Sequence, residues 1–177
     1  APGADSLGSS TARLVEVIDG SLELYDVDLV MEVSQSLFAE EWVLLSLTRA
    51  REVILQRVTL TAVNPGWRPA VLVERHLRDD APVSIMPVVE SLRESDIQIR
   101  DCLFRGNATA YSDRSLEPAV IRISDSAIGV DADAFSLLGA DRADMDGMTR
   151  AATSVRIELD HVAAAPRRVD GVARLHD

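Results

Sequence analysis

The chain has 177 residues, which suits a single domain and is long enough to bury a sizeable core. Its formal net charge is −11 and it contains no lysine, so we expect no basic patch for nucleic acid and no docking on anionic lipid. Because no run of 18 or more apolar residues occurs, the sequence predicts no membrane-spanning helix.

Residues 1–12 are predicted to be a linker or an N-terminal extension, because they lack the basic and apolar parts of a signal peptide. Residues 13–177 are predicted to form one domain. The sequence begins at Ala1 without an initiator Met, so we expect a fragment of a larger, bacterial multidomain protein. Its single cysteine, Cys102, lies at an apolar position and is expected to be a small buried side chain. One cysteine permits no internal disulfide and leaves the localisation undecided.

Short runs of alternating apolar and polar residues follow one another along the chain, and such alternation is typical of β-strands. The first strands are expected as two pairs, Leu14–Ile18 with Leu22–Leu29 and Trp42–Leu47 with Val53–Leu60. Residues 64–69, Asn-Pro-Gly-Trp-Arg-Pro, predict a turn, since Pro and Gly interrupt both strands and helices.

Three later segments are expected to leave this strand rhythm. Arg75–Pro82 is predicted to be a charged surface loop, and Ala132–Leu138 a short helix within the irregular stretch from Val130 to Ala152. Ala163–Arg168 is expected to leave any stack of strands, with the last nine residues capping the stack or fraying.

One pattern of alternation, apolar–x–apolar–x–polar–apolar–x–apolar, returns five times, and its polar residue marks a slip of one position. The copies begin at Leu22, Val53, Ile97, Ile121 and Ile157, and their polar positions hold Asp26, Arg57, Asp101, Asp125 and His161. Residues two apart on a strand share a face, so a slip of one requires a bend or bulge. Asp suits such bends because it tolerates left-handed backbone. Five strand–bend–strand units in a short chain favour stacked coils.

The segments Ile97–Asn107 and Ile121–Ile128 resemble coils of the right-handed parallel β-helix, the pectate-lyase-like fold, and the resemblance covers residues 13–164. We therefore predict an all-β fold, a right-handed parallel β-helix solenoid of about five coils with loop insertions. The 44 residues from Val53 to Ile97 leave room for an extra turn. A leucine-rich repeat is the nearest alternative solenoid, although its leading motif and regular period are missing, and a β-sandwich is the next alternative.

If the copies stack in order, their polar residues form a ladder along one corner of the coils. Adjacent strands lie about 4.8 Å apart, so charges in this ladder would feel one another. Asp26, Arg57 and Asp101 alternate in sign, whereas Asp101 above Asp125 stacks like charges unless an inserted coil or a water separates them. We predict that Arg57 lies against its acidic neighbours in the ladder instead of pointing to bulk solvent.

Acidic residues are the main candidates for metal or sugar chemistry, because lyases of the family that the chain resembles hold Ca²⁺ with clustered acids. The candidate ligands are Asp131, Asp133, Asp141, Asp144 and Asp146. Asp144-Met-Asp146-Gly147 is similar to part of a calcium loop, but neither the EF-hand nor the nonapeptide spacing is complete, so a solvated acidic loop is favoured. Glycoside hydrolases of this fold use paired carboxylates on neighbouring coils. Asp101 and Asp125 occupy the matching positions of two neighbouring copies of the pattern, but a role in the bend is favoured for both.

The remaining reactive and aromatic residues form no catalytic or metal-binding motif. The histidines are His76, His161 and His176, and the aromatic candidates for stacking on a sugar are Trp42, Trp67 and Tyr111. No histidine has a metal-like spacing to another His or Cys, and no Gly-x-Ser-x-Gly elbow or Walker sequence occurs. For the aromatic residues, separate core or loop positions are favoured. Asn107 begins a glycosylation sequon, a triplet that is common by chance.

We therefore expect a non-catalytic β-helix module, a recognition or spacer domain, with no catalytic residue, no metal and no cofactor. Its expected partners are the rest of the parent chain or a protein or carbohydrate surface, without nucleic acid or membrane. Exposed edge strands add the option of edge-to-edge self-association. The first alternative is a divergent Ca²⁺-dependent polysaccharide lyase or glycoside hydrolase, and the second is a cell-surface adhesin segment.

Overall fold

The computed structural model describes residues 10–35, 39–66, 68–76, 94–115, 117–137 and 155–165. Every element of secondary structure in these ranges is a β-strand, so the all-β prediction is confirmed. Their bounds are β1 Thr11–Ile18, β2 Ser21–Tyr25, β3 Asp28–Glu32, β4 Glu41–Thr48, β5 Glu52–Gln56, β6 Thr59–Val63, β7 Ala70–His76, β8 Ser95–Arg100, β9 Leu103–Gly106, β10 Thr109–Arg114, β11 Ala119–Ser124, β12 Ala127–Val130, β13 Phe135–Leu137, β14 Val155–Asp160 and β15 Ala163–Ala164.

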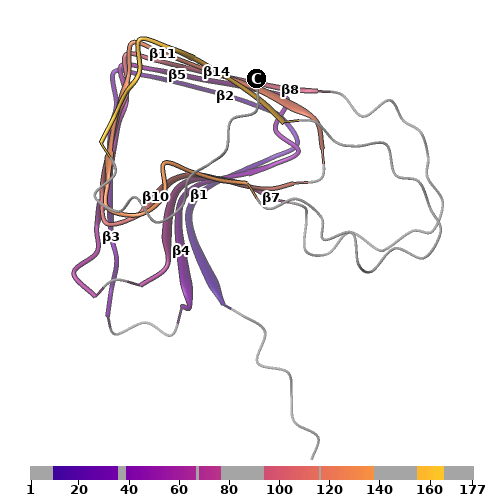
Figure 1. Cartoon of the computed structure of the whole chain (residues 1–177). Helices are drawn as coiled ribbons and strands as arrows, with labels where there is room; N and C mark the ends of the chain where they lie inside the picture. The colour runs from indigo at the N-terminus through magenta and orange to yellow at the C-terminus, as the bar shows by residue number, and fades with distance from the viewer. Residues whose placement is uncertain are drawn as a thin grey trace, which may run out of the picture.

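The strands form three parallel sheets of five strands each, and consecutive strands of the chain belong to different sheets (Figure 1). Sheet A has the order β1-β4-β7-β10-β13, sheet B the order β14-β11-β8-β5-β2, and sheet C the order β15-β12-β9-β6-β3. In Figure 1 the strands of sheet B overlie one another along the top, and those of sheet C along the left side. The chain returns to each sheet at every third strand, which is the arrangement of a β-solenoid.

The apolar residues of the repeated pattern stack in register from strand to strand. In sheet B, Val53 pairs with Ile97, Ile97 with Ile121, and Ile121 with Ile157. Because β5 pairs directly with β8, the long interval between Val53 and Ile97 adds no extra strand to sheet B. Residues 77–93 of that interval lie outside the described residues.

Between sheets B and C the chain turns at the polar residue of each copy. The φ angles at these bends are 54° for Asp26, 54° for Arg57, 53° for Asp101, 49° for Asp125 and 51° for His161. All of them are left-handed, so the predicted bend is confirmed in every copy. The bend amides also link neighbouring copies: Asp26 donates to the carbonyl of Gln56 at 3.1 Å, and Arg57 donates to that of Arg100 at 3.0 Å.

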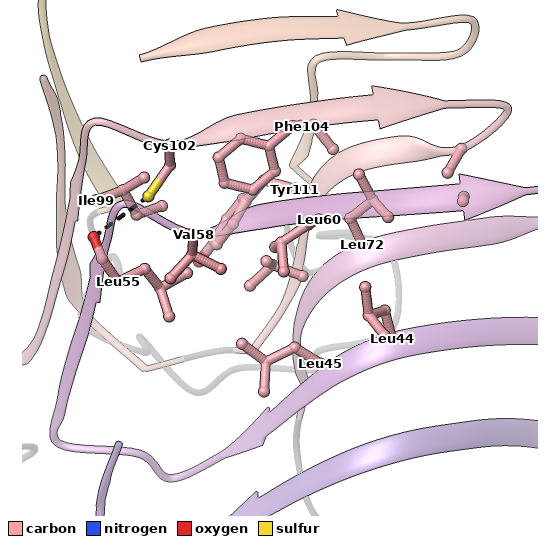
Figure 2. Packing of buried hydrophobic residues seen from close by; sticks show 14 of the residues in the cluster. Leu44, Leu45, Leu55, Val58, Leu60, Leu72, Ile99, Cys102, Phe104 and Tyr111 are labelled. Carbon is pink, nitrogen blue, oxygen red and sulfur yellow. Dashed lines mark hydrogen bonds between the residues drawn. The ribbon is translucent and has the colours of Figure 1, made fainter. Parts of the chain in front are cut away.

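The core lies between the three sheets and is built from the stacked apolar rows. Figure 2 shows Leu60, Phe104 and Tyr111 directed into the same interior, where each side chain is at most 2% exposed. Cys102 is 4% exposed, and its Sγ lies 3.4 Å from the carbonyl oxygen of Leu55. This low exposure confirms the prediction of a small buried side chain, and burial raises the pKa of the Cys102 thiol.

The corner that leads from sheet C back to sheet A is held by two asparagines and a glycine. The side-chain amide of Asn64 donates to the carbonyl of Asn107, and that of Asn107 donates to the carbonyl of Asn64, both at 3.0 Å. Gly106 has a φ of +107° and lies so close to β6 that a Cβ would stand 2.0 Å from the carbonyl oxygen of Ala62. The Asn107 side chain, which begins the sequon, is therefore engaged in joining two coils.

Three segments that are expected outside the strands belong to the sheets. Arg75 and His76 lie in β7 and are 3% and 8% exposed, so their placement in a charged surface loop is wrong. Phe135–Leu137 forms β13 where the sequence predicts a short helix. Ala163–Ala164 does not leave the stack but forms β15 at the edge of sheet C. In each case pairing with a neighbouring strand outweighs the local pattern.

Candidate functional site

The polar bend residues form a ladder at the corner between sheets B and C, as the sequence predicts. Arg57 donates from Nε to Asp26 Oδ1 at 2.5 Å and from Nη2 to Asp26 Oδ2 at 2.7 Å. These hydrogen bonds lower the pKa of the Asp26 carboxyl and raise the pKa of the Arg57 guanidinium, and the charge of Asp101 adds to the second effect. Arg57 therefore lies against its acidic neighbour, as predicted.

The other half of the ladder brings two carboxylates together. The Asp101 amide donates to the carbonyl of Ser124 at 3.2 Å, which places Asp101 and Asp125 on adjacent copies without an inserted strand. His161 Nδ1 lies 3.8 Å from Asp125 Oδ1 and 3.2 Å from Asp160 Oδ1. Asp101 and Asp125 are both exposed residues in left-handed bends, which agrees with the structural role favoured for them.

A second charged pair at the next corner is one that sequence reasoning missed. Asp19 and Arg49 both have a φ of 53°, and the guanidinium of Arg49 forms an ion pair with the Asp19 carboxylate. The Asp19 amide donates to the carbonyl of Thr48 at 3.1 Å, as the bend amides do at the first corner. The sequence feature that could have identified this pair is the charged residue that directly follows the strand of sheet A in each of the first two coils.

The inner side of sheet A holds a buried ion pair. Arg75 Nη1 donates to Asp113 Oδ2 at 2.6 Å, and the two side chains are 4% and 2% exposed. The Tyr111 hydroxyl lies 3.3 Å from Asp113 Oδ2, and the Ser115 amide donates to Asp113 Oδ1 at 2.9 Å. Burial raises the pKa of Asp113, while Arg75 and the Ser115 amide oppose that shift. Burial also raises the pKa of Tyr111. Because all these groups bond to one another, the cluster acts as a polar part of the core.

The other side of sheet A carries a hydroxyl–imidazole–carboxylate cluster centred on His76. Ser46 Oγ lies 3.3 Å from His76 Nδ1, Thr48 Oγ1 lies 3.1 Å from Nε2, and Glu74 Oε2 lies 3.8 Å from Nδ1. Arg114 extends the cluster, since its Nη1 lies 3.3 Å from Glu74 Oε1. These residue types support nucleophilic catalysis when a substrate can reach the hydroxyl. Here Ser46 is 0% and Thr48 is 1% exposed, so neither hydroxyl meets a substrate in this conformation.

The outer face of sheet B contains a groove of about 310 Å³ that crosses β5, β8, β11 and β14. It is lined by Ile54, Leu55, Gln56, Gln98, Ile99, Arg100, Arg122, Ile123, Ser124, Glu158, Leu159 and Asp160. Arg122 donates to Asp96 Oδ1 at 2.5 Å and to Glu158 Oε2 at 3.1 Å. Arg100 is exposed and forms no ion pair with another described residue. The groove therefore offers a cation and several amide and hydroxyl groups to a ligand.

The other predicted candidates that lie within the described ranges do not come together in a site. Trp42 and Tyr111 are 3% and 2% exposed, so they cannot form a sugar-stacking platform. Among the residues that the structure describes, no three His, Cys, Asp or Glu side chains are placed to hold a metal ion. Several candidates lie outside the described residues, namely Trp67, Asp141, Asp144, Asp146 and His176.

Comparisons of the chain with family models, with curated proteins and with solved structures find no match. Within the described ranges, no helix has the length and apolar content needed to cross a membrane. The site must therefore be judged from its geometry. The sheet B groove is the candidate whose polar groups are accessible, whereas the two clusters of sheet A are buried.

Proposed function

We propose that the chain is a non-catalytic recognition module, a right-handed parallel β-helix of five coils and of the pectate-lyase-like type, that binds an extended carbohydrate along the outer face of sheet B. The observation that carries the proposal is the groove across four strands of that sheet. Because the strands are in register, equivalent side chains recur about every 4.8 Å along the groove. An extended chain of sugars presents hydroxyl groups repeatedly, and such a lining can meet them with repeated hydrogen bonds.

The chemistry of one row of the groove supports a polar ligand. One row across the four strands alternates uncharged polar side chains with charged ones, in the order Gln56, Arg100, Ser124 and Asp160. Arg100 lies between Gln56 and Ser124, and its guanidinium forms no ion pair with any other residue that the structure describes. A guanidinium binds planar carboxylates well, so carboxylated sugars are expected to bind more tightly than neutral sugars.

The buried cluster of sheet A supports a non-catalytic role. His76 is held by Ser46 on one ring nitrogen and by Thr48 on the other, and all three are buried. A nucleophile of this kind would need access to the substrate carbon as well as a base. The contacts of His76 instead join strands β4 and β7, which is a structural use of the same residue types.

Binding to an array of neutral and carboxylated oligosaccharides tests the proposal. We expect binding by the unaltered protein and a loss of at least tenfold in affinity for the double variant Gln98→Ala, Arg100→Ala. Arg105→Ala is the matched control, because Arg105 is an exposed arginine on sheet C, outside the groove. Equal losses in both variants, or no binding to any oligosaccharide, would contradict the proposal.

Calcium distinguishes the recognition module from the lyase alternative. A ligand that binds the native state raises the melting temperature by mass action. The recognition module is expected to melt at the same temperature with and without millimolar Ca²⁺. A rise of several degrees, lost in a variant without Asp141, Asp144 and Asp146, would favour a Ca²⁺-dependent lyase.

A further inference from the structure

Both ends of the solenoid expose side chains that are buried in every inner coil. In one row of sheet B, Leu55 is 0%, Ile99 2% and Ile123 2% exposed, whereas Leu159, the member of the same row on the edge strand β14, is 47% exposed. At the other end, Leu14 on the edge strand β1 is 49% exposed. Within the described part of the chain, each end therefore presents apolar side chains together with the edge strands of three parallel sheets.

We propose that the two ends fit each other, so that a second copy of this chain stacks head to tail on the first. In this arrangement the last strands of one copy, β13, β14 and β15, pair with β1, β2 and β3 of the next copy, in parallel and in the existing register. This inference rests on the register of the strands at the two ends and not on ligand binding, although β14 also lines one end of the sheet B groove.

The register of the existing coils supplies apolar partners for the two inward-facing rows of sheet B across the junction. Leu22 pairs with Val53, and the row from Val53 ends at Ile157 on β14. An added copy in the same register therefore places its Leu22 on Ile157, and its Leu24 on Leu159. The half-exposed row of each end is completed by the other.

The hydrogen bonds of the bend extend in the same way. In the existing coils, each bend amide donates to the carbonyl that precedes the next bend, as Asp125 donates to Asp160 at 3.0 Å. The next members of the series are the His161 amide of one copy and the Tyr25 carbonyl of the following copy. On sheet C, the Ala163 amide donates to the carbonyl of Ser126 at 3.0 Å. In the proposed stack the Asp28 amide of the following copy donates in the same way to the corresponding carbonyl of the first copy.

Charge disfavours contact between two first-coil ends. The first-coil end carries Glu16, Glu23 and Asp28 on its strands and Asp26 at its bend, so two such ends would bring carboxylates together. The other end carries Arg156, Glu158 and Asp160 on β14 and His161 at the matching bend, so it is less acidic than the first-coil end. In the existing register Glu23 of the added copy stands opposite Glu158, and this pair of like charges opposes the contact. A head-to-tail junction places His161 beside Asp26, which continues the ladder of the corner with a basic residue against an acid.

A head-to-tail contact is heterologous and does not close on itself, so assembly is expected to form an open series of species. Sedimentation velocity of the full chain over a range of concentrations should show a mass that rises steadily above that of the monomer. A monomer at all concentrations, or a dimer that grows no further, would overturn the proposal.

Two end variants separate head-to-tail stacking from other forms of association. Leu14→Arg blocks the first-coil end and Leu159→Arg the opposite end, and each variant alone should be monomeric. An equimolar mixture should form a dimer that does not grow, because the open end of one variant joins the open end of the other and only blocked ends remain. Val63→Arg is the matched control: Val63 is 47% exposed on the inner strand β6, and the variant should assemble like the unaltered chain.

Far-UV circular dichroism and the melting temperature of each variant confirm that it is folded before its mass is compared. If Leu159→Arg does not fold, His161→Asp replaces it, since Asp tolerates the left-handed bend and puts like charges at the junction. This variant should reduce association at least tenfold. Persistent growth of either single variant, or a mixture that stays monomeric, would refute the head-to-tail arrangement.

Discussion

Gly106→Ala is expected to destabilise the protein more than any other glycine-to-alanine change in the described strands. Gly106 ends β9 with a φ of +107°, where an L side chain is strained. The added Cβ would stand 2.0 Å from the carbonyl oxygen of Ala62 and 2.9 Å from its carbonyl carbon. Both atoms belong to the backbone of the neighbouring strand β6, so no side-chain rotation relieves the contact.

The size of the effect follows from two contributions. A carbon and a carbonyl oxygen approach to about 3.3 Å, so β6 and β9 would have to separate by roughly 1 Å at this pair. Such overpacking costs about 1–3 kcal/mol, and the backbone strain of a non-glycine residue adds about 1–3 kcal/mol. The expected loss of about 2–6 kcal/mol is a large part of the 5–15 kcal/mol typical for a whole domain.

Urea unfolding followed by circular dichroism measures this loss as a fall in the midpoint at constant slope. Gly129→Ala is the control, because Gly129 lies on β12 of the same sheet and its Cβ would meet only the Phe104 carbonyl oxygen, at 3.9 Å. The control should change stability by no more than about 1 kcal/mol. A loss below about 1 kcal/mol in Gly106→Ala, or equal losses in both variants, would show that the close approach of β9 to β6 does not limit stability.

Three further predictions concern the ionisable groups. Asp113→Ala leaves the Arg75 charge buried without its partner and should cost about 3–5 kcal/mol in urea unfolding, and a loss within experimental error would show that the pair is not buried. The hydrogen bonds from Arg57 lower the pKa of Asp26. The ion pair therefore contributes its full stability above the ordinary carboxyl pKa, and this contribution is lost as the pH falls through the pKa of Asp26 in the folded protein. The difference in melting temperature between the unaltered protein and Asp26→Asn should shrink towards pH 3, and a growing difference would contradict this sign. Cys102 is buried and its thiol pKa is raised, so alkylation by iodoacetamide should be slow in the native protein and fast in urea, and equal rates would contradict its burial.

The sequence predicts the corner between sheets B and C well because its signal is local. A one-residue slip in the alternation identifies Asp26, Asp101 and Asp125 as bends without knowledge of the rest of the chain. The neighbour of each bend in the ladder follows from stacking in order, which is how the contact between Arg57 and Asp26 can be foreseen.

Sheet A is predicted less well because the burial of its polar residues depends on partners that lie far away in the sequence. Arg75 belongs to a charged stretch, and what makes it a core residue is Asp113, 38 positions further along the chain. The end strands β13 and β15 are missed for a related reason. Each is short and is held by one neighbouring strand, so little of its own pattern is needed to form it.

The bends of this fold separate the shape of the molecule from its surface chemistry. The same left-handed φ occurs with an acid at Asp125, a guanidinium at Arg57 and an imidazole at His161. The angle at which sheet B meets sheet C is thus fixed by a backbone dihedral that recurs in every coil, and different side chains are compatible with it. Mutation can therefore change the charge along the corner while the cross-section stays constant, which gives evolution or an engineer a line of independently variable positions running the length of the stack.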